Sequence, residues 1–261
     1  MVTVRDIFDS LNAFAPVETK MDFDNVGLLV GTETDAVTRA LVALDITDEV
    51  IDEAIDRRCQ LIVSHHPMFF SLKRVVNSDI KGRKIIKLIQ NNMSAVCMHT
   101  NLDAAEGGVN TVLARLAGIT EPKKLYDVPS CIGLYGELEK PVELRDYLQA
   151  IQKALNVNAL RYVSGGRSVH RLAVVGGSGG GDMERAVELG CDTMLTADIK
   201  YHSFVDAKEL GLNLIDGDHF CTENPVVQVI KQRIEEHFPT VHVYLSEKHR
   251  QTVQIFGTRE C

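Results

Sequence analysis

Short apolar runs alternate with amphipathic stretches along the first half of the chain. Compact apolar runs are typical of buried strands, and apolar side chains three or four positions apart are typical of helices. The apolar runs predict strands over residues 39–46, 60–64 and 94–98. The helical spacing predicts helices that begin near residues 4, 47, 81 and 108. Strands that alternate with helices of this length indicate an α/β layer with a largely parallel sheet.

The pattern changes near residues 121–130, and a second alternation of strands and helices follows. We therefore predict two α/β lobes, the first made of residues 1–125 plus 215–261 and the second of residues 126–214. We expect strands at 132–138, 160–163, 171–175, 193–196 and 212–216, helices at 141–155, 182–189, 201–210 and 225–238, and a closing pair of strands at 240–245 and 252–256.

Composition and charge narrow the class of protein. The chain has 261 residues, 45% of them hydrophobic, and its formal net charge is −8. No apolar run reaches the ~18 residues that a membrane span needs, and the first residues lack the pattern of a secretory signal. We therefore expect a cytoplasmic protein with no membrane partner. The acidic balance and the short, mixed basic patches argue against a nucleic-acid partner.

Histidines and carboxylates follow three of the predicted strands. His65 and His66 follow the run 60–64, and His99 with Asp103 follows the run 94–98. His219 with Glu223 follows the run 212–216. Ligands of open α/β sheets bind beyond the carboxyl ends of the strands. Each of these three groups alone is compatible with an ordinary surface or loop contact. The occurrence of all three at strand ends favours a metal site.

The spacing of these residues suggests a pair of ions. His65 and His66 are adjacent, so along a strand their side chains would diverge and each could bind a different ion. Two metals about 3.5–4 Å apart form the usual two-metal clamp. We expect Glu223 at the start of the helix 225–238, where a carboxylate is favoured as a bridge. Mixed imidazole and carboxylate ligands suit Zn, Mn, Fe or Co, so the expected cofactor is two divalent ions of open identity.

A glycine-rich stretch at residues 176–181 lies between a predicted strand and a predicted helix. Its backbone N–H groups, around Gly177, Ser178 and Gly179, could hold an anion such as phosphate. It does not match a Walker A sequence, and a simple turn before Asp182, which would cap the next helix, is the more ordinary interpretation. Lys200 and His202 form a further candidate pair, either as substrate and acid/base groups or as solvated helix residues.

With these residues in view, the chain resembles the GTP cyclohydrolase 1 type 2 family, also called the NGG-interacting-factor-three-like family. The motifs that carry the resemblance span nearly the whole chain. They are Asp24-Asn-Val-Gly-Leu28, Val63-Ser-His-His-Pro67, His99-Thr-Asn-Leu-Asp103, Val175-Gly-Gly-Ser-Gly179, Thr196-Ala-Asp-Ile-Lys-Tyr-His202 and Asp218-His-Phe-Cys-Thr-Glu223.

The resemblance implies two interlinked α/β lobes with mostly parallel or mixed sheets, a dinuclear metal site in the cleft between them, and a toroidal homohexamer. By the family's pattern, His99 is a site residue close to the metals, and the metal ligands are His65, His66, Asp103, His219 and Glu223. Two positions depart from that pattern: Phe23 replaces the usual Trp, and Ala197 replaces a usual Gly. Neither is a presumed ligand, but both concern the substrate side of the site.

The function that the resemblance implies is hydrolytic opening of the guanine ring of GTP with release of formate. In this hypothesis His99 or His202 moves protons, since imidazole titrates near neutral pH, and the glycine-rich loop with Lys200 holds the phosphates. One alternative is a metal-dependent phosphoesterase or another nucleotide hydrolase, because a two-metal clamp does not specify its electrophile. The other is a non-catalytic metal-binding interaction protein.

Overall fold

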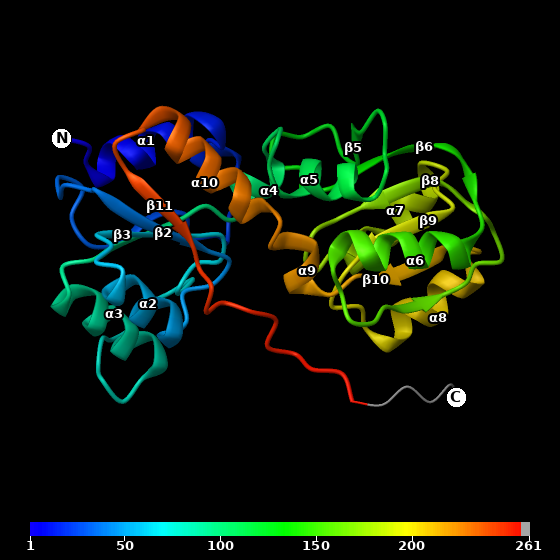
Figure 1. Ribbon diagram of the computed structural model, residues 1–261. Coiled ribbons are helices and arrows are strands. Elements are labelled where there is room, and N and C mark those ends of the chain that lie inside the picture. Colours follow the sequence, from blue (N-terminus) through cyan, green and yellow to red (C-terminus); the bar gives the residue numbers. More distant parts are fainter. Residues whose placement is uncertain (257–261) are drawn as a thin grey trace. The chain divides into compact units, whose positions relative to one another are not determined.

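The computed structural model describes residues 1–256, which fall into two compact units (Figure 1). The first unit comprises Met1–Gly108 and Val226–Arg250. The second comprises Val109–Pro225 and the segment that begins at Gln251. Each unit contains a sheet with helices packed on it, so the predicted α/β class with mixed sheets is confirmed.

The first unit is built on a five-stranded sheet. Its strand order is β1-β4-β3-β2-β11, and all neighbours are parallel except β1 and β4. The strands are β1 (Gly27–Val30), β2 (Arg39–Ala43), β3 (Leu61–Ser64), β4 (Ser94–Cys97) and β11 (His242–Leu245). Because β2, β3 and β4 are central, their side chains are buried on both faces, which explains their near-continuous apolar runs.

Helices cover both faces of this sheet. Figure 1 shows α1 and α10 on one side and α2 and α3 on the other. The α2 and α3 helices pack through Val50, Ile51, Ala54, Ile85 and Leu88 against strand residues that include Leu41 and Ile62. The helices of this unit are α1 (Val4–Phe14), α2 (Asp48–Asp56), α3 (Ile80–Gln90), α4 (Thr100–Ala104) and α10 (Val226–His237), with a 3₁₀ turn η1 (Val17–Thr19).

The second unit is built on a six-stranded sheet of order β5-β6-β8-β9-β10-β7. The central strands β8, β9 and β10 are parallel, and the outer pairs are antiparallel. The strands are β5 (Lys123–Lys124), β6 (Leu134–Val142), β7 (Arg161–Val163), β8 (Val169–Val174), β9 (Thr193–Thr196) and β10 (Asn213–Asp216). Strand alternation divides the core into two layers. Leu172, Leu195 and Ile215 face one layer, whereas Ala173, Met194 and Leu214 face the other.

Each layer of the second unit is covered by its own helices. The first layer contains apolar residues of α5, α6 and α9, and the second contains residues of α7 and α8. The helices are α5 (Val109–Leu116), α6 (Leu144–Leu155), α7 (Met183–Glu188), α8 (Tyr201–Glu209) and α9 (His219–Glu223), with a 3₁₀ turn η2 (Gly180–Asp182).

The observed division of the chain differs from the boundaries that we drew on the sequence. Helix α5 belongs to the second unit because its Leu113 and Ala114 lie in the same core cluster as Leu172 of β8. Helix α9 belongs there too, through Cys221. The residues 109–125 and 215–225, which we assigned to the first lobe, are therefore grouped with the second unit by their packing.

The expected strand over residues 252–256 is wrong. These residues form no strand, and the side chains of Val253, Ile255 and Phe256 are exposed. Apolar residues at alternate positions predict a strand only when a sheet edge is available to pair with it. The partner that we expected, 240–245, pairs with β2 in a parallel ladder through β11 instead.

The segment after β11 is fixed to α2 by one carboxylate. Glu53 is buried and accepts hydrogen bonds from Ser246 Oγ at 2.6 Å, from the Glu247 amide at 3.1 Å and from the Lys248 amide at 3.2 Å. Burial alone would raise the pKa of Glu53, but these hydrogen bonds lower it below its ordinary value. The ionised carboxylate therefore holds residues 246–248 in place.

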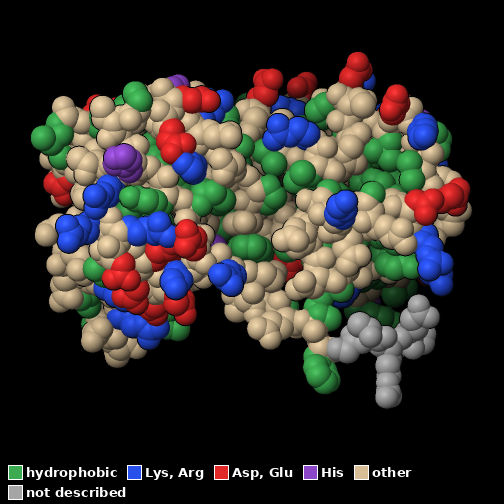
Figure 2. All heavy atoms as spheres, viewed as in Figure 1, with side chains coloured by type: hydrophobic (Ala, Val, Ile, Leu, Met, Phe, Trp, Pro, Cys, Tyr) green, Lys and Arg blue, Asp and Glu red, His purple; other side chains and the backbone are tan. Residues whose placement is uncertain are grey.

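No helix among residues 1–256 is long and apolar enough to cross a membrane. On the face shown in Figure 2, Lys and Arg side chains are interspersed with Asp and Glu side chains. This mixed distribution agrees with the short, mixed basic patches of the sequence.

Replacing Glu53 by Gln should destabilise the fold, whereas replacing the exposed Glu49 of the same helix should not. Loss of charge-assisted hydrogen bonds costs about 1.5–3 kcal/mol of unfolding free energy. A carboxylate whose pKa is lowered by folding stabilises above its unfolded pKa, and this contribution is lost as the pH falls through the folded pKa. The E53Q deficit measured by urea unfolding should therefore be full at neutral pH and shrink in acid. Equal unfolding midpoints for E53Q and E49Q at neutral pH would contradict this.

Candidate metal centre

His65 and His66 stand directly after β3, where the parallel ladder with β2 and β4 ends. The ring of His65 is fully buried, and its Nδ1–H donates to the carbonyl oxygen of Met98 at 2.9 Å. A carbonyl oxygen only accepts, so this bond places a proton on Nδ1 and fixes the direction in which Nε2 points. Nε2 lies 3.6 Å from Oδ1 of Asp103. An imidazole nitrogen and a carboxylate oxygen, two kinds of atom that can hold a metal ion, thus lie close together within the first unit.

His66 is oriented by a carboxylate that the sequence analysis did not identify. Its Nδ1 lies 2.7 Å from Oδ1 of Asp45, which follows β2. The other oxygen of Asp45 lies 3.0 Å from Nε2 of His249, in the segment held by Glu53. Burial alone would raise the pKa of Asp45, but hydrogen bonds from His249 and His66 lower it overall. Asp45 is therefore an anion that accepts a hydrogen bond from Nδ1–H of His66 and fixes the orientation of its ring.

His99 is held in the same way by Asp24. Its Nδ1 lies 2.8 Å from Oδ1 of Asp24, and the other oxygen accepts from the amide of Thr100 at 3.0 Å and from the Thr100 hydroxyl. Burial alone would raise the pKa of Asp24, but the hydrogen bonds from His99 and Thr100 lower it well below its ordinary range. This gives the Asp24 of the Asp24-Asn-Val-Gly motif a structural task, which is to orient His99.

The three imidazoles of the first unit form a cluster. The ring centroids of His65 and His66 are 5.0 Å apart, and that of His99 lies 5.2 Å and 5.6 Å from them. Each ring offers one nitrogen, and these nitrogens lie within 4.8 Å of one another. Metal-ligating histidines nearly always bind a carboxylate or carbonyl through their other nitrogen. The donor set therefore fits a divalent metal ion.

The second unit presents its own imidazole and carboxylate on α9. Asp218, with a φ of +69°, precedes the helix and accepts from the Cys221 amide at 3.1 Å. Positions i and i+4 share one helix face, so Nε2 of His219 lies 3.0 Å from Oε2 of Glu223. Nδ1 of His219 lies 2.7 Å from Oδ2 of Asp198.

Glu223 does not stand at the start of the helix after Pro225, contrary to our expectation. It is the last residue of α9, and α10 begins only at Val226. Its setting is instead made by the glycine-rich loop. Gly177 has a φ of +64°, and a Cβ at this position would lie 2.1 Å from Oε1 of Glu223. The positive φ favours glycine here, and any larger side chain would displace the Glu223 carboxylate, so the loop fixes where this carboxylate lies.

Several backbone donors of the glycine-rich loop already have acceptors. The amide of Gly176 donates to Asn110 Oδ1 at 2.9 Å, that of Gly177 to Thr222 Oγ1 at 3.1 Å, and that of Gly179 to Thr196 Oγ1 at 2.8 Å. These bonds fix the loop against β9 and α9. The expected phosphate-binding role of Gly177, Ser178 and Gly179 stays a prediction, with Gly177 and Gly179 already donating inside the protein.

The remaining candidate residues lie on the surface of the second unit. Lys200 immediately precedes α8, and His202 stands in the first turn of this helix. Both are exposed, and the ring of His202 packs against Tyr201 with centroids 5.4 Å apart. Their proposed roles as acid/base or substrate groups stay predictions.

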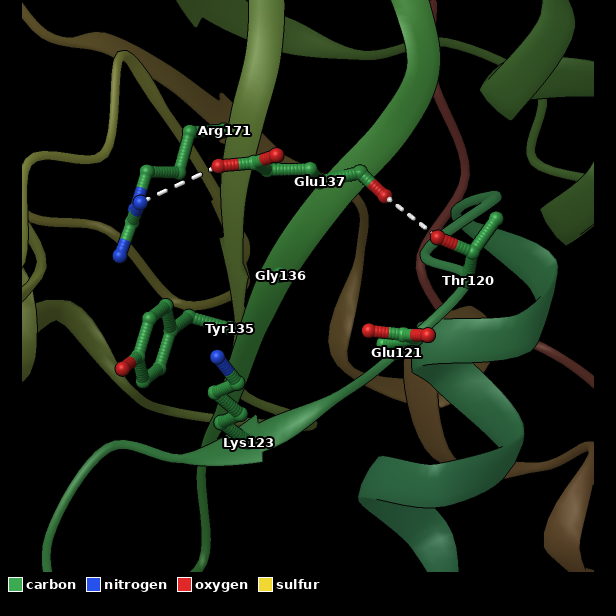
Figure 3. Close-up of a pocket in the computed structure, with 7 residues that line it drawn as sticks. All are labelled: Thr120, Glu121, Lys123, Tyr135, Gly136, Glu137 and Arg171. Carbon is green, nitrogen blue, oxygen red and sulfur yellow. Dashed lines mark hydrogen bonds and ion pairs between the residues drawn. The ribbon is translucent and has the colours of Figure 1, made fainter.

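A separate pocket in the second unit has a balanced charge (Figure 3). Arg171 donates to Glu137 at 3.1 Å, and its guanidinium lies 5.3 Å from the ring centroid of Tyr135. Lys123 and Glu121 also line it. The lining holds two cations and two carboxylates, so the pocket offers no excess charge for an ionic ligand, and we assign it none.

The orienting residues Asp45 and His249 left no usable signal in the sequence. Asp45 is a single carboxylate after a strand, and His249 lies far along the chain from His66. Asp24 and Asp198 lie in motifs that carry the family resemblance. The spacing of residues in these motifs does not show which imidazole each carboxylate holds. Only the fold pairs them, with His99 and His219 respectively.

The fold and these donors define an α/β protein whose buried imidazoles and carboxylates could hold a metal ion. The chain belongs to the Duf34/NIF3 (NGG1p interacting factor 3) family, whose sequence profile matches residues 2–252. The family resemblance stated from the motifs is therefore confirmed.

Relatives and solved structures agree with this assignment. The chain is 36% identical over 239 residues to a protein of Clostridium acetobutylicum named GTP cyclohydrolase 1 type 2 homolog, with 89% of each chain covered. It is 37% identical to a protein of the same name from Clostridium perfringens, covering 89% of this chain and 91% of the relative. A Bacillus cereus protein related to NIF3 has the same fold, with a TM-score of 0.91, 22% identity, and coverage of 98% and 99%.

In the metal-free protein, His219 should stay protonated up to about pH 9. Burial alone would lower its pKa, but hydrogen bonds and charge from Glu223 and Asp198 raise the pKa to about 9. This interaction stabilises the fold fully below the ordinary pKa, about 6.5, and is lost as the pH rises through about 9. In Glu223→Gln the pKa should fall, as followed by NMR titration of the imidazole in the presence of a chelator. Exposed Glu184→Gln is the control, and an unchanged titration in E223Q would refute the assignment.

Proposed function

We propose that the chain is a metal-dependent hydrolase that holds two divalent cations through His65, His66, Asp103, His219 and Glu223. The observation that carries the proposal is the shared orientation of the imidazoles. Each of His65, His66, His99 and His219 has Nδ1 bound to a carbonyl or carboxylate oxygen. In this proposal Nε2 of each ring is the atom that binds the ion, and a ring held through its other nitrogen is typical of metal sites. Support comes from each unit separately, and the family resemblance joins the two sets of ligands.

The kinds of donor atom limit which metal ions the proposed site would bind. Imidazole nitrogen with carboxylate oxygen suits Zn, Mn, Fe or Co, and no thiolate is needed. Bound divalent cations supply Lewis acidity and make water nucleophilic at neutral pH. The protein's own part is to fix the rings: Met98, Asp45, Asp24 and Asp198 hold the four imidazoles so that no rotation is required when an ion binds.

For the substrate, we propose a guanine nucleotide whose ring is opened by hydrolysis with release of formate. The names of the clostridial relatives support GTP as the first substrate to test. Removal of the ring carbon as formate breaks two C–N bonds, and each cleavage consumes one water. In this proposal His99 and His202 move the protons, and Ser178 with Lys200 contacts the phosphates. The resemblance also supports a cytoplasmic homohexamer as the working assembly.

Gly177→Ala should weaken metal binding without unfolding the protein. A methyl group at this position collides with the Glu223 carboxylate, and the φ of +64° adds backbone strain. Loss of such supporting contacts typically costs roughly 10- to 100-fold in metal affinity. Gly180→Ala is the matched control, since a Cβ there meets nothing within 4 Å. Affinities come from competition with a chelating dye, and circular dichroism checks the fold. Equal affinities for G177A and G180A would argue against Glu223 as a ligand.

Turnover provides the test of the activity itself. Wild-type protein loaded with each candidate metal should release formate from GTP, and Asp103→Ala should lose both the metal and the activity. Formate from none of the loaded proteins would reject the GTP assignment, and a screen of phosphoesters and other nucleotides would then follow. Stable metal binding with no turnover on any of them would instead support a non-catalytic metal-binding interaction protein.

A further inference from the structure

Two aromatic rings extend from solvent to the imidazole cluster of the first unit. Phe23 is 64% exposed and Phe70 is 52% exposed. Their ring centroids are 6.0 Å apart with a tilt of 55°, and the centroid of Phe70 lies 5.9 Å from that of His99. The three rings thus form a continuous aromatic surface that ends at a candidate metal ligand.

The loop that carries Phe23 is held in place by hydrogen bonds on both sides of this residue. The Met21 amide donates to Thr100 Oγ1 at 2.9 Å, and Asp24 binds His99 and Thr100. The Asn25 side chain donates to the carbonyl oxygen of Phe69 at 2.8 Å. This last bond ties the Phe23 loop to the segment that carries Phe70.

An exposed aromatic pair on a fixed backbone calls for an explanation. Large apolar side chains that stay in water forgo the free energy of burial, and clustered ones mark binding surfaces. Here the same polar network that orients His99 also presents the two phenylalanines. The surface is therefore built together with the candidate metal centre, and its occupant should reach both.

We propose that Phe23 and Phe70 form a platform, the Phe23/Phe70 platform, that stacks the planar heteroaromatic ring of the substrate beside His99. This inference rests on the proposed hydrolase function and adds to it the ring class that the site accepts. Tilted and offset aromatic contacts tolerate any flat π-face. The platform thus favours planar heteroaromatic rings as a class and requires no particular exocyclic group. It also gives a task to Phe23, which stands where the family's usual residue is Trp.

Equilibrium binding separates the platform from the chemistry. The probes are GTP, ATP and ribose 5-phosphate, which lacks a base, each titrated into metal-loaded protein by calorimetry. Phe70→Ala and Phe70→Leu should lower the affinity for both nucleotides by roughly tenfold or more. Phe23→Ala should lower it to a similar extent. Phe70→Tyr should bind both nucleotides as tightly as the wild type does, because it keeps the aromatic face. The affinity for ribose 5-phosphate should be the same in all of these variants.

Controls keep the result interpretable. Tyr162→Ala removes an aromatic side chain of similar exposure in the second unit and should leave nucleotide binding unchanged. Metal content is measured for every variant, so that loss of ions is not mistaken for loss of stacking. F70L and F70Y keep the volume of the side chain and protect the test against misfolding of F70A.

Each outcome has a distinct meaning. Phe-dependent binding of GTP without formate release would uphold the platform and reject the proposed reaction. Formate release with KM unchanged in F23A and F70L would reject the platform and uphold the reaction. Failure of both nucleotides to bind, or equal loss of ribose 5-phosphate in F70L, would overturn the platform. So would unaltered nucleotide binding in F23A with a changed solution mass, which would indicate contact between copies of the chain.

Discussion

The structure depends on hydrogen bonds that fix imidazole rings through Nδ1. Met98, Asp45 and Asp24 hold His65, His66 and His99 in the first unit, and Asp198 holds His219 in the second. Each bond both selects the tautomer and sets the ring plane. Without it, a histidine at a strand end would sample several rotamers. Binding of an ion would then cost the conformational entropy of ordering each ring. With it, the protein itself holds each ring in one orientation.

The fold supplies these acceptors through the register of the parallel strands. Ser64 of β3 pairs with Cys97 of β4, so His65 and the Met98 carbonyl emerge at the same sheet edge. Asp45 emerges from the neighbouring strand β2 beside His66. Burial opposes ionisation of Asp24 and Asp45, yet several hydrogen bonds to each carboxylate more than offset it, and both pKa values are lowered. The anions that orient the rings are therefore stable parts of the fold.

Hydrophobic periodicity predicted the parts of this picture that depend on local sequence. The buried runs before His65, His99 and His219 are strands, as expected, because central parallel strands need apolar side chains on both faces. The pairings of Asp45 with His66 and of Asp198 with His219 were not predicted, since they join residues that only tertiary packing brings together. The prediction of a strand at 252–256 was wrong for the same reason. Alternation of apolar and polar residues is a local pattern, whereas a strand requires a partner strand to pair with. The setting of Glu223 also depends on a distant residue, Gly177.

X-ray absorption spectroscopy of the protein purified with its own metal tests the central claim most directly. The account predicts a first shell of nitrogen and oxygen at about 2.0–2.2 Å with multiple-scattering features of imidazole, together with a metal neighbour at roughly 3.5–4 Å. A first shell dominated by sulfur at about 2.3 Å, or a spectrum without imidazole scattering, would contradict it.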